Sequence, residues 1–385
     1  MLGLALEGGG AKGAYQIGAY QALMELGYSF DAVAGTSIGA INAALIAQGD
    51  WERARDFWET TSTEDLFSEK DRAFLEVLNR QVGGDTLSLL RENVKAAVKN
   101  GGIDTGRIRA FLEKNLDPER LMQSPMDYGM VAISFPELHP LIAFKKEMTP
   151  ENIVDHVLAS ATFPGFQQTA IGETKYLDGG FYDACPYNIL LERGCDSVIA
   201  IRLHGFGLIR PPKEKDRVLT IEPSGSLGPV MSFDPATSHR NILMGYYDTM
   251  RLLRKLPGRQ YTFTAGVDGL AAFLALPETV IRSAAGLLHI SEEYPPRRAL
   301  FEQILPALAG ELHLAKSADY DTILLAMLEH CAAKAGIERL RYYTPVELQA
   351  LCRPKEVPAP RRGLLPHRED AIGLLLAELP MLTEM

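Results

Sequence analysis

The stretch LGLALEGGGAKGAY, residues 2–15, decides the fold. Residues 2–6 form an apolar run that is typical of a buried strand, and a helical pattern begins at Tyr15. Three consecutive glycines, residues 8–10, separate the two elements. A glycine-rich turn between a strand and a helix directs backbone N–H groups at one point, where they can bind a pyrophosphate or a transient oxyanion. The stretch therefore predicts an α/β fold and leaves the ligand of the turn open.

The spacing of Gly8, Gly10 and Gly13 satisfies G-x-G-x-x-G, which is the dinucleotide-binding fingerprint. That fingerprint also needs an acidic residue near the end of the second strand. Asp31 lies at the start of the predicted second strand, residues 30–34, and GTSIG follows its end. We therefore favour an oxyanion over a dinucleotide as the ligand of the turn.

The pentapeptide GTSIG, residues 35–39, fits the G-x-S-x-G pattern of a nucleophile elbow, with a predicted strand before it and a predicted helix after it. Such an elbow strains the backbone at the serine, so its neighbours must be small, and Gly35 and Gly39 meet this need. The hydroxyl of Ser37 would then stand at a helix N-terminus, which favours developing negative charge. The sequence predicts Ser37 as a nucleophile, the alternative being a Ser-Gly turn that caps a helix.

Two kinds of base are available to Ser37. His204 follows a predicted strand, residues 196–203, and would complete a Ser-His-Asp triad with Asp178 or Asp183. Asp178 could instead act directly, because the two glycines after it let the backbone approach closely. A D-G-G sequence by itself is more typical of an Asx turn, so the residues alone leave this choice open.

The composition of the chain limits the kinds of partner and site that we expect. It has 385 residues, a formal net charge of −10 and 46 % hydrophobic residues, which predicts a globular core. The negative balance argues against nucleic acid as a partner and gives no general attraction to anionic membranes. Four cysteines without a C-x-x-C pair indicate reduced thiols in a cytoplasmic protein. The eight histidines have no metal-ligand spacing, so we expect no metal site.

The sequence has no apolar stretch near the roughly 20 residues that span a bilayer, and no signal-peptide pattern. We therefore expect a cytoplasmic protein whose contact with membranes is peripheral. Residues 269–290 have few charges and could form an interfacial surface. A helical pair buried against a core is the more ordinary interpretation of that stretch.

The remaining elements extend the α/β pattern. Further strands are predicted at 128–135 and 141–145, and a helix at 149–160 with Thr149 as its N-cap and Pro150 at its first position. Residues 51–125 are interpreted as a helical insertion, and residues 205–235 as loops rich in Pro, Gly and Ser. From about residue 260 onward the chain is predicted to be all-helical.

Four motifs occur in order: GGGAKG (8–13), GTSIG (35–39), ASATFPGF (159–166) and DGG (178–180). With them the sequence resembles the patatin-like phospholipase family over roughly residues 1–255. The resemblance implies a three-layer α/β/α sandwich with a mostly parallel central sheet. Residues 256–385 would form a separate, mostly helical region whose role the sequence does not indicate.

The same resemblance implies a lipid acyl-ester hydrolase of the phospholipase A or lysophospholipase type. Ser37 and Asp178 would form a catalytic dyad without histidine, acting through an acyl-enzyme and needing no cofactor or metal. The amides of Gly8, Gly9 and Gly10 would form the oxyanion hole. Supporting positions are Lys12 beside that turn and the glycines Gly35, Gly39, Gly179 and Gly180.

One position departs from the family pattern. Many members have an asparagine where this chain has Ala184, whereas Asp183 and Pro186 are kept. The departure concerns the geometry of the loop, since the asparagine is not catalytic in the family. Cys185 has no basic neighbour in the sequence and is interpreted as structural. Two other functions stay open: a Ser-His-Asp carboxylesterase that uses His204, and a non-catalytic lipid-binding module on the same fold.

Overall fold

The computed structural model describes residues 1–72, 75, 102–291, 293–352 and 367–382. The central part of the predicted insertion, at 73–74 and 76–101, lies outside the described residues. The chain divides into two compact units, Met1–Thr249 and Met250–Met385, where the sequence had suggested a boundary after residue 255. Each unit has its own core.

The first unit is built on an eight-stranded sheet with the order β5-β6-β3-β2-β1-β7-β8, with β4 also paired to β3. Strands β3, β2, β1, β7 and β8 are mutually parallel, whereas β4, β5 and β6 pair antiparallel. The strands are β1 (Leu2–Leu6), β2 (Ala32–Thr36), β3 (Asp127–Phe135), β4 (Pro140–Phe144), β5 (Thr169–Ile171), β6 (Thr174–Asp178), β7 (Ser197–Ile201) and β8 (Val218–Ile221).

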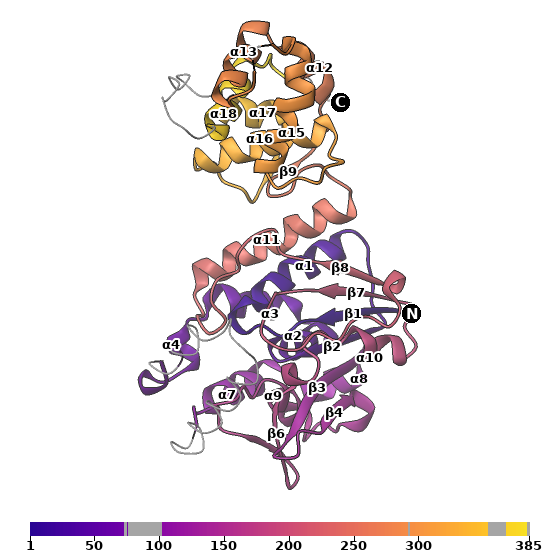
Figure 1. The fold of residues 1–385 in the computed structure, drawn as a ribbon. Helices are drawn as coiled ribbons and strands as arrows, with labels where there is room; N and C mark the ends of the chain where they lie inside the picture. The colour runs from indigo at the N-terminus through magenta and orange to yellow at the C-terminus, as the bar shows by residue number, and fades with distance from the viewer. Residues whose placement is uncertain (73–74, 76–101, 292, 353–366, 383–385) are drawn as a thin grey trace. The chain divides into compact units, whose positions relative to one another are not determined.

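Helices cover both faces of this sheet (Figure 1). Helices α2 and α9 pack on one face, and α10 packs against β1, β2 and β7 on the other, which confirms the expected α/β sandwich. The α-helices are α1 (Ala14–Glu25), α2 (Ile38–Ala47), α3 (Trp51–Thr60), α4 (Thr63–Leu66), α7 (Gly106–Asn115), α8 (Pro118–Gln123), α9 (Ile153–Ser160), α10 (Tyr187–Glu192) and α11 (Pro235–Leu253). Short 3-10 turns are η1 (Gly10–Gly13), η2 (Lys145–Glu147), η3 (Gly179–Phe181) and η4 (Lys215–Arg217).

The pairing along β3 brings two distant strand ends together. Strand β4 occupies one edge of β3 at Gly129–Ile133, so β2 and β6 must share the other edge. On that edge β2 ends with Thr36 opposite Val131, and β6 ends with Asp178 opposite Ala132. Because β6 runs antiparallel to β3, the two strands meet end to end. The residue after β2 is therefore a neighbour of the last residue of β6.

The structure differs from three local expectations: the start of one helix, the N-cap of that helix, and a loop region that contains a strand. The helix expected at 149–160 begins at Ile153, and Asn152 rather than Thr149 is its N-cap. The side chain of Asn152 accepts a hydrogen bond from the amide of Thr149, so a turn precedes the helix. The loops expected at 205–235 contain β8, which needs β7 beside it to form a ladder.

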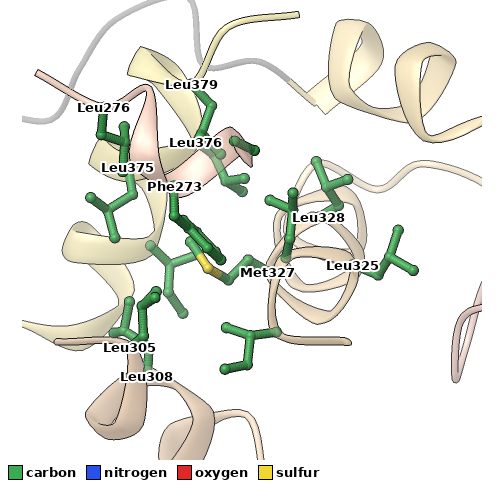
Figure 2. Close-up of a cluster of buried hydrophobic side chains, with 14 of the residues drawn as sticks. Phe273, Leu276, Leu305, Leu308, Leu325, Met327, Leu328, Leu375, Leu376 and Leu379 are labelled. Carbon is green, nitrogen blue, oxygen red and sulfur yellow. The ribbon is translucent and has the colours of Figure 1, made fainter. Parts of the chain in front are cut away.

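The second unit is a helical bundle with a two-stranded parallel pair, β9 (Thr262–Phe263) and β10 (Tyr342–Tyr343), which the all-helical prediction missed. Its core is largely aliphatic with four buried aromatic rings, and Figure 2 shows Phe273 and Met327 among leucines from several helices. The helices are α12 (Gly269–Leu274), α13 (Glu278–Leu287), α14 (Pro296–Ala299), η5 (Leu300–Ile304), α15 (Leu305–Glu311), α16 (Tyr320–Lys334), α17 (Pro345–Cys352) and α18 (Arg368–Glu378).

The stretch 269–290 contributes to this core. Phe273, Leu276, Ile281 and Ala284 are buried in the cluster, whereas Leu270 and Leu274 are 45 % and 49 % exposed. The stretch therefore packs against the core of the unit, as the interpretation as a helical pair expects, and also presents two exposed leucines. Among the described residues, none of the helices has the length and apolar character needed to cross a membrane.

Candidate active site

Ser37 lies in a tight turn between β2 and α2. Its backbone has φ 57° and ψ −128°, a strained conformation for a residue with a side chain. The turn closes only because its flanks are glycines: a Cβ on Gly35 would lie 2.1 Å from the carbonyl oxygen of Gly39. A Cβ on Gly39 would lie 2.3 Å from the carbonyl oxygen of Leu6 in β1. The local geometry is that of a nucleophile elbow.

A second serine holds this elbow in place, and the sequence analysis did not single it out. The amide of Ser37 donates to Oγ of Ser160 at 3.0 Å, and that hydroxyl donates to the carbonyl oxygen of Val131 at 2.6 Å. Ser160 is fully buried at the end of α9, within the ASATFPGF motif. Its position in that motif was the only signal in the sequence.

Asp178 lies beside Ser37, as the end-to-end meeting of β2 and β6 requires. Its side chain is 4 % exposed, and its Oδ1 accepts a hydrogen bond from the amide of Gly180 at 2.8 Å. Burial raises the pKa of Asp178 to about 6, against the opposing effect of hydrogen bonds from the Ser37 hydroxyl and the Gly180 amide. A Cβ on Gly179 would lie 2.1 Å from the carbonyl oxygen of Val131, so this close approach also needs glycine.

The glycine turn runs past the elbow. A Cβ on Gly8 would lie 3.1 Å from Cβ of Ser37, which places the start of the turn against the nucleophile. The amide of Gly8 donates to the carbonyl oxygen of Ala184 at 2.9 Å. This amide is therefore already used, which corrects its assignment to the oxyanion hole. The candidates that remain in the turn are the amides of Gly9 and Gly10, and Gly10 has a φ of 55°.

The polar residues that flank the turn are engaged with the segment after β7. Nζ of Lys12 donates to the carbonyl oxygen of His204 at 2.7 Å, and burial lowers the pKa of Lys12. Glu7, immediately before the glycines, is buried and forms an ion pair with Arg202, with 2.7 Å between Oε2 and Nε. No sequence motif singles out Glu7, because an acidic residue directly after a strand forms no distinctive pattern.

An apolar pocket opens at Ser37. It encloses about 570 Å³ of empty space, part of it open to solvent, and its wall includes six phenylalanines. Only Ser37 and Gly10 among its lining residues belong to the candidate catalytic groups. The lining residues are Gly10, Ser37, Ile38, Ile41, Phe57, Leu66, Phe67, Ile108, Phe111, Ala161, Phe163, Phe166, Met231 and Phe233.

The predicted helical insertion supplies one side of this pocket. Phe57 comes from α3, Leu66 from α4 and Phe111 from α7, and the rings of Phe57 and Phe111 lie 4.1 Å apart between centroids. Phe163 and Phe166 of the ASATFPGF motif line another part of the wall. The phenylalanines come from elements far apart in the sequence, so no local pattern could have predicted the pocket.

The competing residues lie in other surroundings. The side chain of His204 is 55 % exposed, with its Nε2 3.6 Å from Oε1 of Glu222, so it faces an exposed carboxylate. Asp183 is buried, and its carbonyl oxygen accepts the hydroxyl hydrogen bond of Thr36 at 2.8 Å. Burial raises the pKa of Asp183 to about 7. Burial also raises the pKa of the Cys185 thiol well above its usual range, which fits a structural cysteine.

Within the described part of the chain, no three His, Cys, Asp or Glu side chains gather as a candidate metal site. The chemistry available at Ser37 is that of its hydroxyl, the Asp178 carboxyl, the backbone amides of the turn and the N-terminus of α2. These are the groups that acyl transfer requires.

Comparisons with known proteins identify a family domain in this chain. Residues 4–191 match the family model described as patatin-like phospholipase. An uncharacterized NTE family protein of Mycobacterium tuberculosis is 28 % identical over 206 residues, which cover 52 % of this chain and 49 % of that protein. The chain thus spans about half the length of the curated relatives it matches first. A lysophospholipase of Aspergillus terreus is 53 % identical over 47 residues, 12 % of this chain and 3 % of that protein.

Among solved structures, VipD from Legionella pneumophila aligns with a TM-score of 0.43 and 17 % identity, over 91 % of this chain and 83 % of that one. The family match covers the strands and helices that carry the glycine turn, the elbow and Asp178. Residues 4–191 of this chain are therefore a patatin-like phospholipase domain.

Proposed function

We propose that this protein hydrolyses acyl esters of lipids, with Ser37 as nucleophile and Asp178 as its base. One observation carries the proposal: a serine in a strained elbow lines an apolar pocket and lies beside a buried carboxyl. Each part has a use in ester hydrolysis, because the elbow exposes the hydroxyl, the carboxyl takes its proton and the pocket accommodates a hydrocarbon chain.

The first half-reaction is acylation. Asp178 accepts the proton of the Ser37 hydroxyl while its oxygen attacks the ester carbonyl carbon, forming a tetrahedral intermediate. The intermediate collapses with cleavage of the ester C–O bond. The leaving alcohol or lysolipid takes the proton from Asp178, and the acyl group remains on Ser37.

The oxyanion of the intermediate needs donors that are in place before the reaction. The amides of Gly9 and Gly10 are our candidates, since that of Gly8 donates to Ala184. An oxyanion-hole donor contributes on the order of 3 kcal/mol to transition-state stabilisation. The N-terminus of α2, directly after Ser37, adds a favourable dipole.

Deacylation repeats the sequence with water. Asp178 takes a proton from a water molecule that attacks the acyl-enzyme, and it returns the proton to Ser37 as the free acid leaves. Asp178 must be ionised at the start of both half-reactions. A pKa of about 6 leaves it ionised at neutral pH and still basic enough to accept a proton.

The pocket supports a lipid acyl chain as the part of the substrate that is recognised. Phenylalanines and aliphatic side chains form nearly all of its wall. A hydrocarbon chain bound there would be removed from water, which favours binding by about 0.8 kcal/mol per buried CH₂. Such substrates are presented at a lipid surface, so we expect peripheral contact with membranes or micelles. The charged headgroup would remain outside the pocket.

Labelling with a fluorophosphonate probe, followed by peptide mapping, tests the proposal. We expect an adduct on Ser37 that is lost in Ser37→Ala, together with release of fatty acid from phospholipid or lysophospholipid vesicles. The His204→Ala variant should keep its activity, because only a Ser-His-Asp esterase would need that side chain. A folded protein that binds the vesicles but gives neither adduct nor fatty acid would instead be a lipid-binding module.

A further inference from the structure

A buried carboxylate that the proposed mechanism does not use lies directly before the glycine turn. The side chain of Glu7 is 2 % exposed, whereas that of its partner Arg202 is 20 % exposed. Removing a carboxylate from water is strongly unfavourable unless other groups compensate its charge. The position therefore needs a physical explanation.

Three donors from one short segment, Arg202–Gly205, compensate this charge. Oε2 of Glu7 accepts hydrogen bonds from Nε of Arg202 at 2.7 Å and from the amide of Leu203 at 2.5 Å. Oε1 accepts from the amide of Gly205 at 3.2 Å. The carboxylate thus holds the backbone of the segment at two amides, and it also holds the guanidinium group of Arg202.

Lys12 binds the same segment from the other end of the turn. Its Nζ donates to the carbonyl oxygen of His204 at 2.7 Å. Glu7 and Lys12 flank the glycines in the sequence, so both ends of the turn are tied to Arg202–Gly205 by charged side chains.

The glycines themselves rest on this segment. A Cβ on Gly9 would lie 2.9 Å from Cδ1 of Leu203, and a Cβ on Gly205 would lie 2.0 Å from the carbonyl oxygen of Gly8. The surfaces are in direct contact, so a shift of Arg202–Gly205 moves Gly9 with it. The position of the Gly9 amide relative to Ser37 therefore depends on the contacts made by Glu7.

We propose that Glu7 is a positioning residue for the oxyanion hole, which it sets by holding Arg202–Gly205 against the glycine turn. The inference rests on the proposed function and adds a residue to it. Arg202 neutralises the carboxylate, so the pair fixes the turn without adding uncompensated negative charge near the oxyanion. Glu7 acts through the amides and does not touch the substrate.

Kinetics of Glu7→Gln on a soluble p-nitrophenyl ester test this assignment. The substitution keeps the shape of the side chain but directs an NH₂ group at donors, so the segment should shift. We expect kcat to fall about 10- to 100-fold with KM nearly unchanged, because an oxyanion hole acts on the transition state. The inhibition constant of a trifluoromethyl ketone, whose adduct with Ser37 mimics the oxyanion, should rise by a similar factor.

Glu222→Gln is the matched control. It removes a carboxylate on the same arginine, 3.8 Å from Nη1 of Arg202, but from an exposed position. Wild-type kcat is expected for this variant. If Glu7→Gln does not fold, as judged by circular dichroism, Arg202→Lys replaces it, with the same expectation of a lowered kcat at unchanged KM.

The outcomes separate this inference from the proposed function. A folded Glu7→Gln, or Arg202→Lys in its place, with wild-type kcat and inhibitor affinity overturns the inference while Ser37 chemistry stands. An equal rise in KM and in the inhibition constant would also overturn the inference, because such a result would indicate a general structural role for Glu7. Hydrolysis that persists in Ser37→Ala would instead remove the proposed function.

Discussion

Each unit of the chain buries a glutamate that accepts backbone amides. In the first unit Glu7 holds Leu203 and Gly205, next to the glycine turn. In the second unit Oε1 of Glu329 accepts the amides of Arg259, Gln260 and Tyr261 at 2.7, 2.9 and 2.9 Å. The first contact borders a candidate active site, whereas the second ties a loop to the hydrophobic core of its unit. Similar local chemistry therefore serves positioning in one unit and stability in the other.

Glycines around Ser37 and two helical glycines of the second unit differ in the space around them. Around Ser37 several glycines stand where even one methyl group would meet a carbonyl oxygen, as at Gly35 and Gly39. In the second unit Gly286 and Gly373 have open space around them. A side chain does not fit at the glycines around Ser37, whereas it fits at these two helical positions, so substitutions should affect the two sets differently.

The largest effect is expected for Asp178→Asn. Loss of the base should lower kcat on the order of 10³-fold. The same variant should unfold at a higher temperature at pH 8, because ionising a carboxyl whose pKa is raised by burial costs folding free energy. The matched control is Asp183→Asn, which changes another buried carboxyl. A larger loss of kcat in the control would mean that Asp183 is the base.

The next effect contrasts two glycines in helices. Gly39→Ala in α2 forces a Cβ to within 2.3 Å of the Leu6 carbonyl oxygen, so the first unit should lose about 3 kcal/mol or more of its free energy of unfolding. Gly373→Ala in α18 meets nothing within 4 Å and should stabilise the second unit by about 0.5 to 1 kcal/mol. Urea unfolding of both variants measures the difference. Equal effects would contradict the contrast between the two positions.

Glu329→Gln should affect stability alone. Three backbone amides would donate to a neutral side-chain amide instead of a carboxylate. The free energy of unfolding should fall by about 1 to 3 kcal/mol as a result. The kcat for ester hydrolysis should stay at the wild-type value, in contrast to Glu7→Gln. A kcat lowered at unchanged KM in Glu329→Gln would show that buried glutamates in the two units are not functionally distinct.

The smallest expected effect is that of mild acid. Because Asp178 must be ionised and its pKa is raised to about 6, kcat/KM should decline about tenfold per pH unit below that value. The free energy of unfolding changes with pH in the opposite direction. Because the pKa of Asp178 is raised in the folded state, this group stabilises the fold at low pH, and its contribution is lost as pH rises from about 4 to 6. A pH–rate profile of the wild type measures the first effect, and a flat profile down to pH 5 would contradict it.

The sequence by itself determined the local structure of the site. The strand at residues 2–6, the glycine turn and the elbow at 35–39 follow from short-range constraints: apolar runs, glycines where side chains do not fit and a serine between small neighbours. Four motifs in order were enough to indicate the family, and residues 4–191 match its model.

Only the tertiary structure decided which groups meet. The contact of Ser37 with Asp178 arises because β2 and β6 share one edge of β3, a pairing between strands far apart in the chain. The use of the Gly8 amide by Ala184, the holding of the turn by Glu7 and the assembly of the phenylalanine pocket are likewise long-range contacts. A local sequence pattern encodes the conformation of its own segment, whereas these partners are chosen by sheet register and packing.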